Sequence, residues 1–231
     1  MKFLKRIFCR LVILAVILVA VLAGARYVIK ENFFPYKYKE YVDKYSLEYD
    51  LDPLLVLAVI KTESKFNEDA KSHKNAVGLM QITVETGEWA AKEMGYNTFS
   101  KENLYDEEYN IRMGCWYLRR LNDIFNGDLD LTIAAYNAGP TNVQSWLQNE
   151  KYSSNGKSID YIPFGETKKY VDKVDTYYHV YQYFYNKDNS YFNTDEVIDS
   201  LQNIEKTQVR LASWKPDPEV VAFLKNWTNG R

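Results

Sequence analysis

The longest apolar stretch of the chain lies near the N-terminus, at positions 11–25. As a helix, these fifteen residues rise about 22 Å, less than the roughly 30 Å hydrocarbon core of a bilayer, which is typical of a signal sequence cleaved near Ala25. If Arg26 extends its charged end to the interface, the apolar segment becomes residues 7–29 and is long enough to cross a membrane. The pattern leaves both interpretations open and favours an uncleaved anchor within residues 1–30.

Basic residues before the apolar run set its expected orientation. Lys2, Lys5, Arg6 and Arg10 precede the run, and only Arg26 follows it directly. Because positive charges stay on the cytoplasmic side, both interpretations place the N-terminus in the cytoplasm and the chain beyond about residue 30 outside the membrane. We expect a single-pass protein of the cell membrane or, alternatively, a secreted one. A buried helix of a soluble domain would not explain the basic cluster.

The remaining sequence shows helical spacing of apolar residues and no sustained alternation typical of strands. Asp52 followed by Pro53 is a strong helix start, and the residues at 54–60 are apolar on all sides, which predicts a buried helix. Further helices are expected at 84–94, 107–125, 131–138, 140–147 and 166–185. The polar stretch 149–160 is typical of a loop. These patterns predict an all-α fold.

Three segments are expected after the N-terminal residues 1–30. Residues 31–45 are rich in tyrosine and lysine and are expected to begin a short membrane-proximal helix, and residues 46–189 form the main domain. The segment 190–231 is expected to be a C-terminal extension with helices at 195–211 and 218–227. A packed helical extension is favoured there over a dedicated binding tail, and its role stays open.

Composition excludes several classes of function. The net charge is −2, whereas a nucleic-acid-binding domain usually has a strongly basic face, so nucleic acid is not an expected partner. Two cysteines cannot form a disulfide framework, and two histidines make a histidine-rich metal site improbable. We therefore expect no metal and no cofactor. Aromatic residues make up 16% of the chain, which is unusually high.

Glu63 is the first candidate for catalysis. It lies at the end of the apolar helix, and Ile60, Val59 and Val56 precede it by three, four and seven positions, so its carboxyl continues an apolar stripe. Apolar surroundings raise the pKa of a carboxyl, and a raised pKa allows a general acid to keep its proton near neutral pH. The competing interpretation is a solvated helix terminus.

Two further patterns lie near apolar helices, and each is weak on its own. In residues 78–81, a glycine comes shortly before a glutamine, a pattern that is equally typical of the start of a helix. Residues 134–139 are also typical of a helix that ends at a C-terminal glycine cap. Together with Glu63-Ser64 and with residues 72–81 and 162–171, however, these two patterns resemble the motifs of the soluble-type lytic transglycosylases, relatives of goose-type lysozyme. The resemblance covers residues 46–186.

Asn75 and Asp50 depart from that family, which usually has glycine at both positions. Asn and Asp are the other residues that best tolerate left-handed backbone, so both turns are expected to persist. The segment 190–231 has no counterpart in the resemblance.

The resemblance implies a lysozyme-like helical catalytic domain that acts on the glycan strands of peptidoglycan. Glu63 would cleave the bond between N-acetylmuramic acid and N-acetylglucosamine with formation of a 1,6-anhydro ring. The residues implied in substrate binding are Ser72, Met80, Gln81, Tyr136, Asn137 and Glu166. Of these, Ser72 and Glu166 would also position the catalytic carboxyl, although Glu166 fits equally a favourable charge at a helix N-terminus. Protein partners stay unknown.

Two other functions are compatible with the same motifs. The first is a hydrolytic lysozyme, in which water replaces the internal hydroxyl. The second is a wall-binding module that needs no catalytic glutamate.

Overall fold

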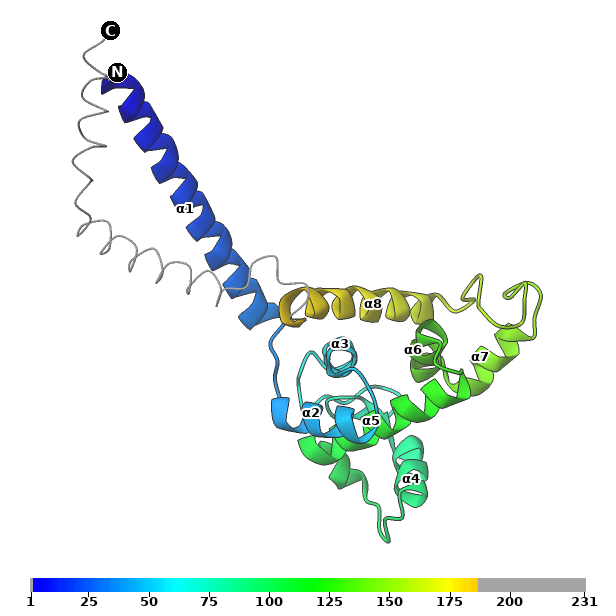
Figure 1. Cartoon of the computed structure of the whole chain (residues 1–231). Coiled ribbons are helices and arrows are strands. Elements are labelled where there is room, and N and C mark those ends of the chain that lie inside the picture. Colours follow the sequence, from blue (N-terminus) through cyan, green and yellow to red (C-terminus); the bar gives the residue numbers. More distant parts are fainter. Residues whose placement is uncertain (1, 187–231) are drawn as a thin grey trace, which may run out of the picture. The chain divides into compact units, whose positions relative to one another are not determined.

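The computed structural model describes residues 2–186, and its α-helices are labelled in Figure 1. The expected extension 190–231, with its two predicted helices, lies outside the described residues. The elements are α1 (Lys2–Phe33), α2 (Lys39–Glu48), α3 (Pro53–Glu63), β1 (Ala76–Val77), β2 (Ile82–Thr83), α4 (Val84–Glu93), the 3-10 helix η1 (Lys101–Tyr105), α5 (Glu107–Ile124), α6 (Leu129–Ala138), α7 (Pro140–Leu147) and α8 (Gly165–Tyr185). The predicted all-α class is confirmed.

The short antiparallel ladder of β1 and β2 was not expected from the sequence. It pairs Ala76 with Thr83 and Val77 with Ile82. Strands of two residues are too short to show an alternating pattern, so periodicity could not have predicted them. The ladder closes the loop that contains Gly78 and Gln81, and it therefore bears directly on the site described below.

Most helix boundaries agree with the hydrophobic pattern, and side-chain caps explain where they fall. Asp52 accepts a hydrogen bond from the Leu54 N–H at 2.8 Å, so α3 begins at the expected Asp-Pro pair. Helix α6 begins two residues before the predicted position because Asp128 caps it, accepting from the Leu131 N–H at 3.0 Å. The short helix expected near residues 31–45 is α2, which starts later and continues to Glu48.

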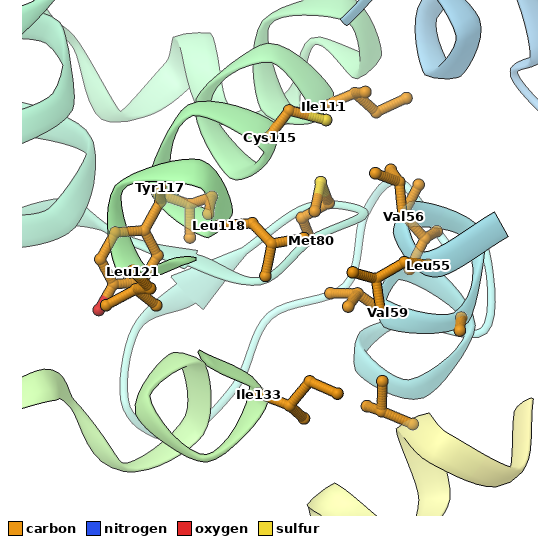
Figure 2. Close-up of a cluster of buried hydrophobic side chains, with 14 of the residues drawn as sticks. Leu55, Val56, Val59, Met80, Ile111, Cys115, Tyr117, Leu118, Leu121 and Ile133 are labelled. Atoms are coloured by element: carbon orange, nitrogen blue, oxygen red, sulfur yellow. The ribbon is translucent and has the colours of Figure 1, made fainter. Parts of the chain in front are cut away.

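Helix α3 is the centre of the hydrophobic core, as its uniformly apolar sequence predicts. Its residues 55–60 are buried, and it packs against α8 and α2, while α6 packs against α5 and α8. Figure 2 shows part of this core, with the labelled side chains Leu55, Val56, Val59, Met80, Ile111, Cys115, Tyr117, Leu118, Leu121 and Ile133. Glu63, one turn beyond Val59 and Ile60, is thereby held at the edge of the core.

Helix α1 contains the apolar N-terminal run. Its segment Lys5–Phe33 has a mean hydropathy of 2.8 in its most apolar window, and the side chains of that window are exposed. By length and composition this helix can cross a membrane, although a signal sequence near the N-terminus has the same properties.

Both positions at which the chain departs from the family's glycines have left-handed backbone. The φ angle is 52° at Asp50 and 59° at Asn75. The expectation that Asn and Asp preserve these turns is confirmed.

Candidate active site

A cleft of about 300 Å³ lies where the end of α3, the segment 72–83, the α6–α7 junction and the start of α8 meet. Six of the predicted site residues line it: Glu63, Ser72, Gln81, Tyr136, Asn137 and Glu166. These residues come from segments far apart in the sequence, and the fold brings them to one cavity. A cavity lined by aromatic, amide and carboxyl groups suits a polar ligand with apolar faces, such as a sugar chain.

Glu63 occupies an environment that favours its protonated form. Burial raises the pKa of Glu63 to about 7, against the opposing effects of a hydrogen bond from Tyr170 and of the nearby charge of Lys173. The Tyr170 hydroxyl donates to Oε1 of Glu63 at 2.6 Å. The carboxyl is thus oriented by one defined donor, and near neutral pH both its protonated and its ionised forms are populated.

Two tyrosines lie near this carboxyl, the buried Tyr170 and the partly buried Tyr136. Burial raises the pKa of Tyr136 and of Tyr170 well above the ordinary value, and the charge of Glu63 adds to both shifts. Both phenols therefore stay protonated near neutral pH and act as hydrogen-bond donors. Tyr136 donates to the backbone oxygen of Met80 at 2.9 Å, and its ring packs against Tyr117 with 5.3 Å between ring centroids.

The loop between β1 and β2 places Gln81 at the cleft. Gly78 has a φ angle of 79° and Gln81 one of 50°, so the chain reverses sharply within four residues. The Gln81 amide nitrogen donates to the backbone oxygens of Ala70 at 3.0 Å and Gly78 at 2.9 Å. Because the nitrogen is committed to the loop, the side-chain oxygen is the part of Gln81 available to a ligand.

The buried side chain of Asn110, in α5, supports this loop with hydrogen bonds. Its side-chain oxygen accepts from the Met80 N–H at 2.8 Å, and its nitrogen donates to the oxygens of Val77 at 2.9 Å and Leu104 at 2.8 Å. One side chain thus satisfies three backbone groups that would otherwise be unpaired inside the protein. Asn110 was not among the predicted site residues, because nothing local in α5 marks it.

Met80 does not meet the expectation of a substrate contact. Its side chain is fully buried and does not line the cleft. It packs so closely on Gly114 that a Cβ added there would lie 2.2 Å from the Met80 sulfur. Gln81, the next residue, lines the cleft while Met80 enters the core.

Ser72 and Glu166 line the cleft, and neither forms a hydrogen bond with Glu63 in the described structure. The Ser72 hydroxyl accepts from the N–H groups of Lys74 at 3.2 Å and Ala76 at 3.1 Å and so holds its own turn. Glu166 pairs with Lys74 at 3.5 Å, and both side chains are largely exposed. The orienting contact to Glu63 comes instead from Tyr170, which lies within the matched segment 162–171 but was not among the predicted site residues.

A residue in the first turn of α8 fixes the side chain of Asn137. Thr167 is buried, and its hydroxyl donates to Oδ1 of Asn137 at 2.8 Å. The amide nitrogen of Asn137 therefore remains for a ligand in the cleft. Within residues 2–186, no group of three or more His, Cys, Asp or Glu side chains is placed to hold a metal ion.

A helical domain with a desolvated glutamate at the end of its central helix, facing an amide and two phenols, has the architecture of a lysozyme-like lytic transglycosylase domain. The chain belongs to the transglycosylase SLT domain family, whose model matches residues 40–159.

Relatives of known name support this membership. The chain is 33% identical over 167 residues to the soluble lytic murein transglycosylase of Escherichia coli K12, and 31% identical over 171 residues to a putative one of Haemophilus influenzae. These matches cover 71% and 72% of this chain but 26% and 28% of the relatives, so the chain spans about a quarter of their length.

Solved structures give the same result. The fold matches an inactive Glu-to-Gln mutant of the lytic transglycosylase Slt of Pseudomonas aeruginosa, with a TM-score of 0.61, 31% identity, and coverage of 68% of this chain and 26% of that one. It also matches the 70-kDa soluble lytic transglycosylase of Escherichia coli, with a TM-score of 0.61, 32% identity, and coverage of 71% and 27%.

Proposed function

We propose that this protein is a membrane-anchored lytic transglycosylase that cleaves the bond between N-acetylmuramic acid and N-acetylglucosamine in peptidoglycan. The observation that carries the proposal is Glu63, whose pKa is raised to about 7 in a cleft lined by Tyr136, Gln81 and Asn137. The names of the relatives and the inactivity of a Glu-to-Gln mutant in one of them support a reaction that depends on one glutamate.

In the first step, protonated Glu63 gives its proton to the glycosidic oxygen. The bond from that oxygen to C1 of the muramyl sugar breaks, and the N-acetylglucosamine part leaves with a new hydroxyl. A raised pKa suits this step because the acid must hold its proton until the substrate is bound. The hydrogen bond from Tyr170 keeps the carboxyl in place and stabilises the carboxylate that results.

In the second step, the Glu63 carboxylate takes the proton from the C6 hydroxyl of the muramyl sugar. The C6 oxygen then bonds to C1 and closes the 1,6-anhydro ring, and Glu63 regains its proton. No water is consumed. A hydroxyl already attached to the reacting sugar has a large effective concentration, so one residue acting first as acid and then as base is sufficient.

The other cleft residues are assigned to binding. Tyr136, Gln81 and Asn137 offer a phenol, an amide oxygen and an amide nitrogen toward the N-acetyl and hydroxyl groups of the sugars. Ser72 and Glu166 are assigned to the sugar contacts at the rim of the cleft.

Hydrolysis is the alternative that shares this site. Most hydrolytic glycosidases use a second carboxylate, either as the base that activates water or as the nucleophile. Among the described residues that line the cleft, the acidic ones are Glu63 and Glu166, and Glu166 is exposed and paired with Lys74. An exposed side chain with this one long ion pair is not held in a fixed position opposite Glu63, and the lytic route is therefore preferred.

Mass spectrometry of peptidoglycan digested by the full chain tests the reaction. The lytic route yields muropeptides lighter by one water than their hydrolytic counterparts. Products without this loss would favour a lysozyme and contradict the proposal. We expect Glu63→Gln to abolish cleavage, and Glu166→Gln to form anhydro products at a reduced rate. If the native chain bound the wall without cleaving it, the protein would be a non-catalytic module.

Membrane anchoring is the second part of the proposal. The length and exposed apolar surface of α1, together with the basic residues before it, support a single crossing with the catalytic domain outside. Sequencing the N-terminus of the mature protein tests it. An intact N-terminus supports the anchor, whereas a start near Arg26 would indicate a cleaved signal sequence.

A further inference from the structure

The last turns of α1 lie against the last turn of α8. The Arg26 guanidinium lies over the ring of Tyr183, 4.7 Å from its centroid, and 5.5 Å from that of Phe184. One helical turn later, the Lys30 ammonium lies over the ring of Tyr185 at 4.5 Å. Both cations face α8 and are half-buried, whereas Tyr27 between them is 64% exposed. Cation–π contacts of this kind strengthen as water is removed.

The residues directly after α1 stabilise the contact between α1 and α8. The ring of Phe34 lies edge-on to Tyr177 and Tyr181, with centroids 5.6 and 5.5 Å apart. The Tyr185 hydroxyl donates to the backbone oxygen of Phe34 at 2.8 Å, and the Tyr181 hydroxyl donates to that of Pro35 at 3.2 Å. The chain that leaves α1 is therefore bound to α8 and does not form a free tether.

The depth of these rings follows from the length of the apolar run. The membrane-crossing segment expected for the anchor, residues 7–29, rises about 34 Å, slightly more than a hydrocarbon core of roughly 30 Å. Arg26 lies three residues, or about 4.5 Å, before the outer end of that segment, close to the edge of the hydrocarbon. Side chains in contact with Arg26 lie at the same depth, and Tyr183 and Phe184 are such side chains.

We propose that residues 183–185, the last turn of α8, lie in the outer interface of the bilayer and dock the catalytic domain on the lipid surface. This inference rests on the membrane anchor of the proposed function. Tyr183 is 50% exposed and Phe33 is 59% exposed, although both flank the α1–α8 contact. Exposed aromatic rings beside Arg and Lys, at the end of an apolar helix, are the side chains that membrane interfaces favour.

The docking sets how far the active site lies from the membrane. Along helix α8, Tyr183 in the last turn follows Glu166 at the cleft by seventeen residues, a rise of about 25 Å. The cleft is thus held within about 25 Å of the interface along one rigid helix. The substrate reached in this position is the glycan strand that lies next to the membrane.

Fluorescence quenching by brominated lipid tests the docking. The full chain carrying Tyr183→Trp, which keeps an aromatic ring over Arg26, is reconstituted in phosphatidylethanolamine–phosphatidylglycerol vesicles with or without bromine on the acyl chains. The matched control is Tyr161→Trp, at a tyrosine that is 58% exposed near the other end of α8. Subtracting the parent chain removes the emission of the five native tryptophans.

The added emission of Tyr183→Trp is expected to shift to shorter wavelength and to lose most of its intensity in brominated vesicles, while that of Tyr161→Trp is unchanged. If the chain sediments with vesicles and digests peptidoglycan but the two variants respond alike, this inference is wrong and the proposed function stands. The exposed rings would then face a protein partner or water. If the chain does not sediment with vesicles, the anchor and the docking both fail.

Discussion

The hydroxyl of Tyr170 lies 2.6 Å from Oε1 of Glu63, although 107 positions separate the two residues in the chain. Helix α8 therefore supplies the group that orients the carboxyl at the end of α3. The two helices pack directly against each other, so the core that stabilises the fold also sets this distance.

Replacing Tyr170 by Phe tests its positioning role. Because the hydrogen bond favours the carboxylate, Tyr170→Phe should raise the pKa of Glu63 above its value of about 7. The alkaline limb of the pH–rate profile should then move up by about 1 pH unit, and kcat should fall about tenfold, each equivalent to about 1.4 kcal/mol. The control is Tyr181→Phe, which removes a hydroxyl from the same helix. Equal pH profiles for the two variants would contradict the role.

Glu63→Gln should remove activity and yet stabilise the protein at high pH. The carboxyl keeps its proton in the folded chain up to about pH 7 but loses it near pH 4.5 when unfolded, so ionisation costs stability as pH rises through this range. The variant lacks this cost, and it should gain up to about 3 kcal/mol over the parent at pH 8 and nothing near pH 4. Denaturant unfolding at both pH values measures the difference. Exposed Glu166→Gln is the control and should show no such gain.

Gly78→Ala should destabilise the loop at the cleft far more than the backbone angle alone explains. A Cβ at Gly78 would lie 2.5 Å from the Leu104 oxygen and 2.2 Å from the Asn110 side chain. Gly95→Ala is a matched control, since Gly95 has a similar φ of 75° and open space around it. We expect a loss of about 1 kcal/mol for the control and several times that for Gly78→Ala, measured by denaturant unfolding. Similar losses would show that the close contact is unimportant.

Asn110→Leu should weaken both folding and activity, because it leaves three buried backbone groups without a partner. The expected loss of stability is about 3 kcal/mol or more, and activity should fall because Gln81 loses its fixed position. Asn142→Ala removes one exposed hydrogen bond to the Ala138 oxygen and should cost less than about 1 kcal/mol. A stable and fully active Asn110→Leu chain would argue against this support.

Met80→Leu should leave KM for glycan unchanged. The Met80 side chain is fully buried, and a swap of similar volume in a core usually costs less than about 1.5 kcal/mol. Gln81→Ala, one position later, should raise KM because it removes an amide from the cleft. A raised KM for Met80→Leu would restore the substrate contact first expected for this residue.

Several features of the fold could be predicted because they depend on local physics. The apolar sequence of α3 requires burial on all sides, and Asp52 with Pro53 starts that helix whatever surrounds it. The stripe through Val56, Val59 and Ile60 placed Glu63 against the core, and the raised pKa follows from that position. Such features need only neighbours within a turn or two of one helix.

Tertiary structure decided the features that join distant segments. No periodicity links Tyr170 to Glu63, Asn110 to the loop at residues 77–80, or Arg26 to Tyr183, because each pair meets only after helices pack. Met80 and Gln81 are adjacent in sequence, yet Met80 enters the core and Gln81 lines the cleft. Local sequence determined which residues are buried and which helices form, whereas the direction in which a polar group points depended on partners that only the folded chain supplies.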